Sequence, residues 1–180
     1  IEALRQPMED GFISVTRTAA KTAYPADFML VAAMNPCPCG NFGSQVKPCK
    51  CNKFQIERYL SRISGPVLDR IDIHVEMTDV SYDDITAKQD GESSAVIRER
   101  VTKARDIQRL RYRDEVILFN AQLNSKLISK YCMLTPDAER ILELSQKKMG
   151  FSVRAYTRIL NVARTIADLA GEADITRQAI

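Results

Sequence analysis

Long apolar runs, histidine and net charge are all scarce in this sequence. No apolar stretch approaches the ~18 residues that a membrane-spanning helix needs, so we expect no membrane partner and a cytoplasmic protein. His74 is the only histidine and lies in a predicted strand, so we assign it no catalytic role. The net charge of +3 does not by itself indicate a nucleic-acid partner. The 180 residues suffice for one domain, or for a core with a small second domain.

The first half of the chain carries strand patterns. Residues 12–16 alternate apolar and polar side chains, and Gly11 and Pro25 around the next stretch favour a β-hairpin. Residues 28–33 and 71–77 predict two buried or half-buried strands of an incomplete sheet. The helical patterns of this half are the end of an amphipathic helix at 1–8 and a helix at 54–63 that Ser64-Gly65-Pro66 breaks.

The second half predicts helices only. A polar stretch at 81–94 reads as a linker. Three helices follow: one capped by Ser94 and running to about Arg113, one starting at Thr135-Pro136, and one between Ser152 and Gly171. We therefore expect an α/β part at 1–80, a linker at 81–94 and an all-α part at 95–180.

Five blocks in a fixed order carry a family resemblance. They are residues 2–11, the hairpin, residues 30–40, residues 62–72 and residues 154–160. Together they resemble the magnesium-chelatase-like AAA+ ATPases of the YifB/ComM type. The resemblance implies the C-terminal part of a P-loop NTPase core followed by a helical lid. The chain has no Gly-x-x-x-x-Gly-Lys-[Ser/Thr] loop, and the family places that loop and the Walker B acid before Ile1. We therefore expect ATP and Mg²⁺ to act in the full-length protein only, and this chain not to hydrolyse ATP alone.

The resemblance implies three catalytic or nucleotide-binding residues. Asn35 matches sensor 1, an amide that orients the attacking water or contacts the γ-phosphate without adding charge; a turn-capping asparagine is the alternative. Arg70 matches the arginine finger that reaches a neighbouring subunit's nucleotide. Its alternative role is an ion pair with Asp69 or Asp72, and Arg58 or Arg62 would then serve as the finger.

Arg154 resembles the sensor 2 arginine of the lid. On its helix a predicted apolar stripe lies on one side and Arg154 and Arg158 lie on another, where a solvated face is the alternative. The stripe comprises Tyr156, Ile159, Ala163, Ala167 and Ala170.

Four cysteines form the pattern C-x-C-x9-C-x-C at Cys37, Cys39, Cys49 and Cys51. Four thiolates within fifteen residues predict a tetrahedral zinc site that anchors an irregular insertion. The C-x-C pairs depart from the usual C-x2-C spacing, so free structural thiols are the alternative. Disulfides are disfavoured in a cytosolic protein, and the isolated Cys132 is expected to be a structural thiol.

Basic residues point to DNA as the partner. The hairpin bearing Arg17 and Lys21 matches the pre-sensor 1 hairpin that lines the pore of hexameric relatives. Residues 98–113 hold seven basic residues against two acidic ones. Within this stretch four arginines share one helix side that could track phosphates or be solvated: Arg98, Arg105, Arg109 and Arg113.

Three functions are compatible with this resemblance. The first is a ring-forming ATPase that remodels DNA, as in the branch migration that ComM-type relatives perform during competence for natural transformation. The second is a magnesium-chelatase-type ATPase subunit that drives metal insertion into a porphyrin. The third is a protein-remodelling AAA+ module.

Overall fold

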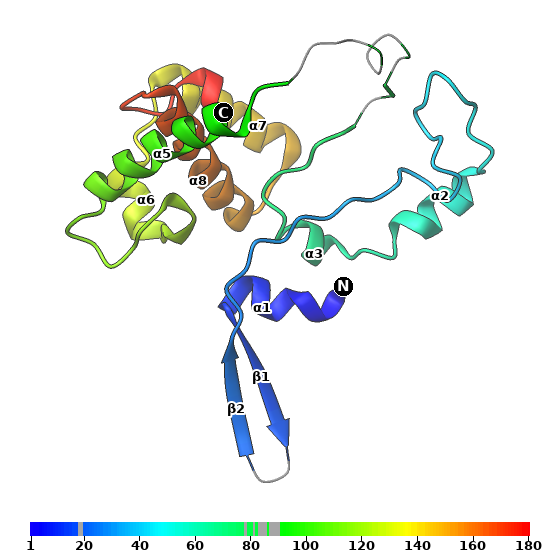
Figure 1. Ribbon diagram of the computed structural model, residues 1–180, viewed down its shortest axis with the longest axis horizontal. Helices are drawn as coiled ribbons and strands as arrows, with labels where there is room; N and C mark the ends of the chain where they lie inside the picture. Colours follow the sequence, from blue (N-terminus) through cyan, green and yellow to red (C-terminus); the bar gives the residue numbers. More distant parts are fainter. Residues whose placement is uncertain (18–19, 78, 81, 83–85, 87–90) are drawn as a thin grey trace. The chain divides into compact units, whose positions relative to one another are not determined.

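The computed structural model describes residues 1–17, 20–77, 79–80, 82, 86 and 91–180. They divide into two compact units, Ile1–Ala87 and Lys88–Ile180 (Figure 1). Most of the predicted linker at 81–94 lies outside the described residues.

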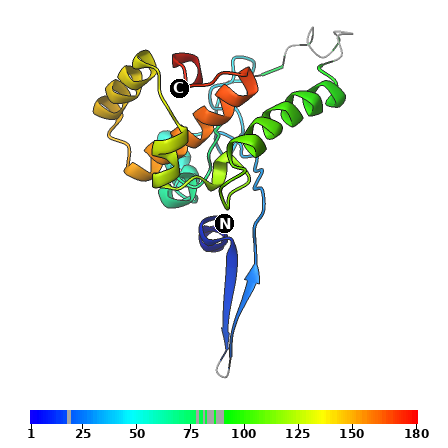
Figure 2. The ribbon, with the colours of Figure 1, turned by 90° about the vertical axis from the view of Figure 1, so that its left-hand side faces the viewer.

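The first unit is built around a β-hairpin. A 3-10 turn, η1 (Glu2–Leu4), leads into the short helix α1 (Arg5–Asp10). Strands β1 (Phe12–Arg17) and β2 (Ala20–Pro25) then pair antiparallel, in the register that joins Phe12 to Pro25. Figures 1 and 2 show the two strands side by side, leading away from α1. The predicted hairpin is confirmed.

Two helices follow the cysteine-rich loop. α2 (Lys53–Leu60) begins with a capping box in which Asn52 and Gln55 exchange hydrogen bonds of 2.9 and 3.0 Å. It ends three residues earlier than the predicted 54–63. The predicted breaker Ser64-Gly65-Pro66 starts the short helix α3 (Gly65–Leu68), because a proline is tolerated in the first turn, where its missing N–H has no helical partner.

The two predicted buried strands are absent from the described residues. Residues 28–33 and 71–77 have neither strand nor helix assignment, and Met29 and Val31 are 88% and 85% exposed. A buried strand needs neighbours that pair with its N–H and C=O groups. The described part of the chain forms only the β1–β2 sheet, so segments 28–33 and 71–77 have no neighbouring strand to pair with there.

The second unit is helical, as predicted. Its N-caps are Ser93, Asn124, Thr135 and Ser152, and each side chain accepts a hydrogen bond from a backbone N–H three residues on. The first helix is therefore capped by Ser93, not Ser94, and ends at Arg111, not Arg113. The helical elements are α5 (Ser94–Arg111), η2 (Asn120–Gln122), α6 (Ser125–Tyr131), α7 (Pro136–Met149), α8 (Val153–Ala170) and η3 (Arg177–Ala179).

The core of the second unit forms where α8 packs against α5, α6 and η2. Ala163 and Ala167 are fully buried, because their small side chains let neighbouring elements approach α8 closely. The C-terminal segment joins this core through a β-bridge: the Ile175 N–H donates to the Met133 carbonyl and the Thr135 N–H to the Ile175 carbonyl. Other buried members are Tyr112, Leu123, Leu127, Ile128, Cys132, Leu142, Leu160 and Ala179.

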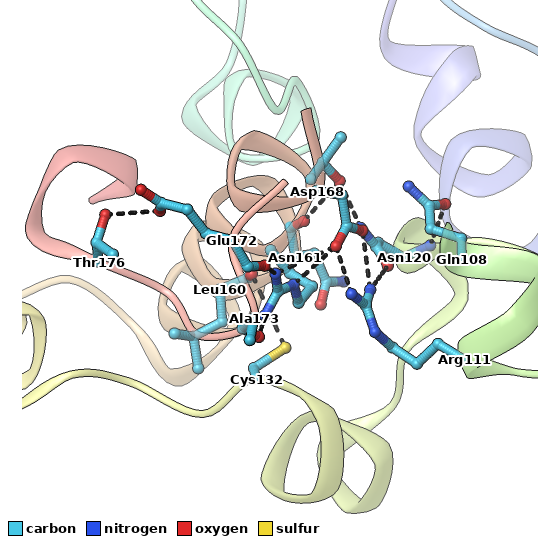
Figure 3. Close-up of polar contacts among 12 residues, drawn as sticks. Gln108, Arg111, Asn120, Cys132, Leu160, Asn161, Asp168, Glu172, Ala173 and Thr176 are labelled. Carbon is cyan, nitrogen blue, oxygen red and sulfur yellow. Dashed lines mark hydrogen bonds and ion pairs between the residues drawn. The ribbon is translucent and has the colours of Figure 1, made fainter. Parts of the chain in front are cut away.

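A buried polar cluster runs through this apolar core (Figure 3). Asp168 is 2% exposed, and its carboxylate accepts hydrogen bonds from both terminal nitrogens of Arg111 and from Asn120 Nδ2 at 2.9 Å. Arg164 is fully buried; it donates to Asp168 and, at 2.6 and 2.7 Å, to the carbonyls of Ala173 and Glu172. Asp168 thereby ties α5, η2 and α8 together.

The buried side of α8 differs from the predicted one, because it includes members of the polar cluster. Leu160, Arg164 and Asp168 join Ala163 and Ala167 in the buried stripe. From the predicted stripe, Tyr156 is 37% exposed and Ala170 is also exposed. The prediction counted apolar residues only, and it missed two charged residues that neutralise one another.

Replacing Asp168 with Asn should strongly destabilise the second unit. The change keeps the shape but leaves the buried guanidinium of Arg164 and the partly buried one of Arg111 without an anion, at a cost of about 3–5 kcal/mol. Asp106→Asn is the matched control, since it breaks the exposed Arg109–Asp106 pair, worth about 1 kcal/mol or less. Urea unfolding followed by circular dichroism measures both. Equal losses for the two variants would contradict this account.

Candidate functional site

Four sulfur atoms converge in the loop between Asn35 and α2. The Sγ atoms of Cys37, Cys39, Cys49 and Cys51 all lie within 4.8 Å of one another. Cys37 lies 3.4 Å from Cys39 and 3.7 Å from Cys49, and Cys39 lies 3.6 Å from Cys49. These separations are too long for disulfides, and the cysteines are free.

The loop backbone folds so that both C-x-C pairs face one point. The Gly40 N–H donates to the Cys37 carbonyl at 3.0 Å, and Gly40 has φ +79°, which an L side chain adopts only with strain. The second pair is followed at once by Asn52, the N-cap of α2. A rigid helix start thus fixes one end of the loop.

Asp79 holds the outer turn of the loop, a role the sequence analysis missed. Its carboxylate accepts from the Ser44 hydroxyl at 2.7 Å and from the Gln45 N–H at 3.0 Å. The Ser44 hydrogen bond lowers the pKa of Asp79. The Ser44 hydroxyl also accepts from the N–H groups of Val46 and Lys47, which closes the turn.

The thiols differ in acidity. Backbone N–H groups of Asn41 and Lys50 stabilise the Cys39 thiolate and lower its pKa to about 6. Burial raises the pKa of Cys51 to about 12. Burial likewise raises the pKa of Cys132 to about 11, and this distant cysteine lies in the helical core, as predicted. Cys132 is therefore an inert thiol, whereas Cys39 carries the charge that a soft metal ion binds.

The geometry of the four sulfurs fits zinc. A tetrahedron with ~2.3 Å zinc–sulfur bonds has sulfur–sulfur edges of ~3.8 Å, close to the separations found here. An all-thiolate donor set suits Zn²⁺ better than it suits Mg²⁺ or Ca²⁺. The predicted donors therefore come together, while the metal itself stays a prediction.

Asn35 lies directly before this loop. Its side chain is exposed, and its Cγ would lie 4.0 Å from a Cβ at Gly40. The residue ends the extended segment 28–35, not a paired strand. Asn35 therefore lies beside the cysteine cluster, and its role as sensor 1 stays a prediction.

Arg70 is engaged within its own unit. Its side chain is 10% exposed, forms an ion pair with Glu9 of α1 and donates to the Pro66 carbonyl. The two alternatives for the finger are exposed: Arg58 on α2, and Arg62, which lies just beyond that helix. The sequence analysis did not identify Glu9, because its partner is 61 residues away.

Arg154, the predicted sensor 2 residue, lies in the first turn of α8 and is half-buried, as is Arg158 one turn later. Its sensor role stays a prediction. In the hairpin, Lys21 is exposed and pairs in register with Thr16, while the side chain of Arg17 lies outside the described part of the structure.

His74, the only histidine, is exposed, and its ring lies 3.2 Å from the Ile71 carbonyl.

The basic side of α5 is largely occupied by intramolecular contacts. Arg109 pairs with Asp106 at 2.9 Å, and Arg105 lies 4.8 Å from the centre of the Phe119 ring. Beyond the helix end, Arg113 pairs with Asp114 at 3.2 Å. A phosphate at this face would compete with these partners, and a role of the face in binding nucleic acid stays a prediction.

Comparison with known families covers both units. The family described as "Magnesium chelatase, subunit ChlI" matches residues 1–85, and the one described as "Magnesium chelatase, subunit ChlI C-terminal" matches residues 91–180. The chain belongs to the magnesium chelatase ChlI family. It is thus a member of an AAA+-like ATPase family, of the YifB/ComM type.

Individual relatives of this family give the same result. The chain is 46% identical to competence protein ComM of Haemophilus influenzae over 97% of its length. It is 44% and 43% identical to the YifB proteins of Salmonella typhimurium and Escherichia coli, over 99% of its length in both cases. The chain covers only about a third of each relative, 33% of ComM and 34% of each YifB protein. In the described ranges, no helix combines the length and apolar character that crossing a membrane requires.

The zinc prediction can be tested by metal analysis. The purified chain, kept reduced, should hold about one zinc per molecule, with zinc–sulfur distances near ~2.3 Å by X-ray absorption. Cys39→Ala should abolish stoichiometric binding, because three thiolates leave the tetrahedron open. Cys132→Ala, the matched control, should keep the metal. Metal-free wild-type protein under reducing conditions would show that the cysteines are structural thiols.

Proposed function

We propose that the full-length protein is a ring-forming AAA+ ATPase that couples ATP hydrolysis to DNA remodelling, of the branch-migration kind used in natural transformation. The observation that carries the proposal is the 46% identity to competence protein ComM across nearly the whole chain. Residues 1–80 are then the C-terminal part of the ATPase core, 81–94 the linker and 95–180 the lid. ATP and Mg²⁺ bind the full-length protein, which acts in the cytoplasm as a hexamer.

Three side chains act on the nucleotide in this proposal. Asn35 is sensor 1, whose neutral amide both donates and accepts a hydrogen bond near the γ-phosphate. Arg154 is sensor 2, and its place in the first turn of α8 lets movement of the lid bring it to the nucleotide of its own subunit. Arg70 is the finger that stabilises transition-state charge in the neighbouring subunit.

The hairpin is the DNA-binding element of the proposal. Ile13, Val15 and Tyr24 are 44%, 41% and 55% exposed, so the face they share is not covered by the rest of its unit. Arg17 is the last residue of β1 and Lys21 the second residue of β2, so both basic residues stand near the turn of the hairpin in the sequence. An uncovered strand pair with basic residues near its tip suits a ring pore through which a phosphate backbone passes.

Zinc has a structural role in this proposal. The four thiolates anchor the loop 37–51, which has no helix or strand of its own. The loop directly follows Asn35, so the metal would also fix the position of the sensor 1 amide.

A second candidate function is that of a magnesium-chelatase-type ATPase subunit that drives metal insertion into a porphyrin. The names of the two matching families favour it. A protein-remodelling AAA+ module is a third, less supported, class.

DNA dependence separates these functions. The ATPase rate of the full-length protein should rise severalfold on adding DNA, because the hairpin couples DNA binding to the ring. Lys21→Glu should reduce this stimulation by placing like charge against phosphate, while Lys53→Glu, an exposed site on α2, should not. An ATPase indifferent to DNA but stimulated by porphyrin-synthesis partner subunits would instead support the chelatase function.

Mixed rings test the finger assignment. Arg70→Ala should lower ATPase activity by ~10³-fold or more and leave ATP binding largely intact. Mixing these subunits with subunits defective in their own phosphate loop should restore some activity, because an intact loop then meets an intact finger. Arg154→Ala should not be rescued in this way, since it acts within one subunit. If mixed rings form without recovery, Arg70 does not act in trans, and Arg58 or Arg62 becomes the finger.

A further inference from the structure

The guanidinium of Arg70 is held by a carboxylate from another element. Arg70 follows the end of α3, and its ion-pair partner Glu9 lies in the last turn of α1. Its side chain is only 10% exposed, so this contact removes the group from solvent. The buried Nε–H has no acceptor among the described residues. This unsatisfied donor costs free energy, so the arrangement holds Arg70 less firmly than a fully bonded one would.

Glu9 is tied directly to the hairpin. Only Asp10 and Gly11 separate it from the first residue of β1. Gly11 adopts the left-handed conformation with φ +69°, and its carbonyl accepts a 2.7 Å hydrogen bond from the Ala26 N–H just past β2. The base of the hairpin is therefore closed against the end of α1, so a tilt of the strands moves the Glu9 carboxylate.

A second contact fixes the other end of this segment to the start of α3. The Glu2 carboxylate accepts from the Ser64 hydroxyl at 2.9 Å and from the Ser64 N–H at 3.2 Å. The segment 2–10 thus joins the segment 64–70 at two points, one near each end. Glu2 and Ser64 provide a fixed attachment, and the Glu9–Arg70 pair is the contact nearest the hairpin.

We propose that Glu9 is a positioning residue that holds Arg70 within its own subunit, and that DNA at the hairpin weakens this hold. This inference rests on the proposed function, in which Arg70 is the finger and the hairpin meets DNA. The direct ion pair competes with the nucleotide phosphates of the neighbouring subunit for the same guanidinium. Moving α1 with the hairpin removes the competing carboxylate and lets the finger reach across the interface.

Glu9→Gln in the full-length protein tests the proposal. Without DNA, the variant should turn over ATP about tenfold faster than wild type, because a neutral amide holds a guanidinium less well than a carboxylate does. The KM for ATP should stay unchanged and the stimulation by DNA should shrink. Glu9→Asp should restore the slow basal rate. Asp10→Asn, which removes the neighbouring carboxylate on α1, should behave like wild type.

The outcomes separate this inference from the proposed function. An unchanged or slower basal rate in Glu9→Gln, with wild-type DNA stimulation intact, overturns the inference alone. A wild-type ATPase that ignores DNA, or an Arg70→Ala variant that keeps full activity, overturns the proposed function on which it rests. If Asp10→Asn accelerates the basal rate as much as Glu9→Gln, general loss of negative charge on α1 explains the effect, and the inference is wrong.

Discussion

The Asp168 carboxylate is the interaction on which the helical unit depends. It accepts hydrogen bonds from Arg111 on α5, Asn120 on η2 and Arg164 on α8, and Arg164 continues to the carbonyls of Glu172 and Ala173 (Figure 3). Apolar packing around small alanines brings the helices together, and this single anion then fixes which turn of one helix faces which turn of another.

The first unit is held together differently. It buries few apolar side chains, Val67 and Cys37 among them, and polar contacts join segments that are distant in the sequence: Glu2 with Ser64, Glu9 with Arg70 and Asp79 with Ser44. Segments 28–33 and 71–77 have neither strand nor helix and expose apolar side chains, among them Met29, Val31 and Val75.

Features that depend on residues close together in the sequence were predicted correctly, whereas features that depend on distant residues were not. The hairpin, the caps at Thr135 and Ser152 and the stop at Gly171 were all predicted, because each depends on residues a few positions apart. The convergence of the four cysteines followed from their spacing in the same way. The strands at 28–33 and 71–77 were wrong because strand pairing depends on partners a pattern does not contain. The Arg111–Asp168 pair was missed because charged residues usually indicate a solvated surface. For Arg70 an ion pair with Asp69 or Asp72 was considered, and its partner Glu9 was missed because it lies 61 residues away.

Because Cys132 is buried, reagents that alkylate thiols can modify the cysteine-rich loop selectively. A thiol in the helical core whose pKa is raised to about 11 reacts slowly with alkylating reagents while the protein is folded. Any fast thiol reaction of the native chain therefore arises from the loop, where Cys39 is both exposed and acidic. In the metal-free chain, a fluorescent maleimide would then label this loop in preference to Cys132 and place a reporter close to Asn35.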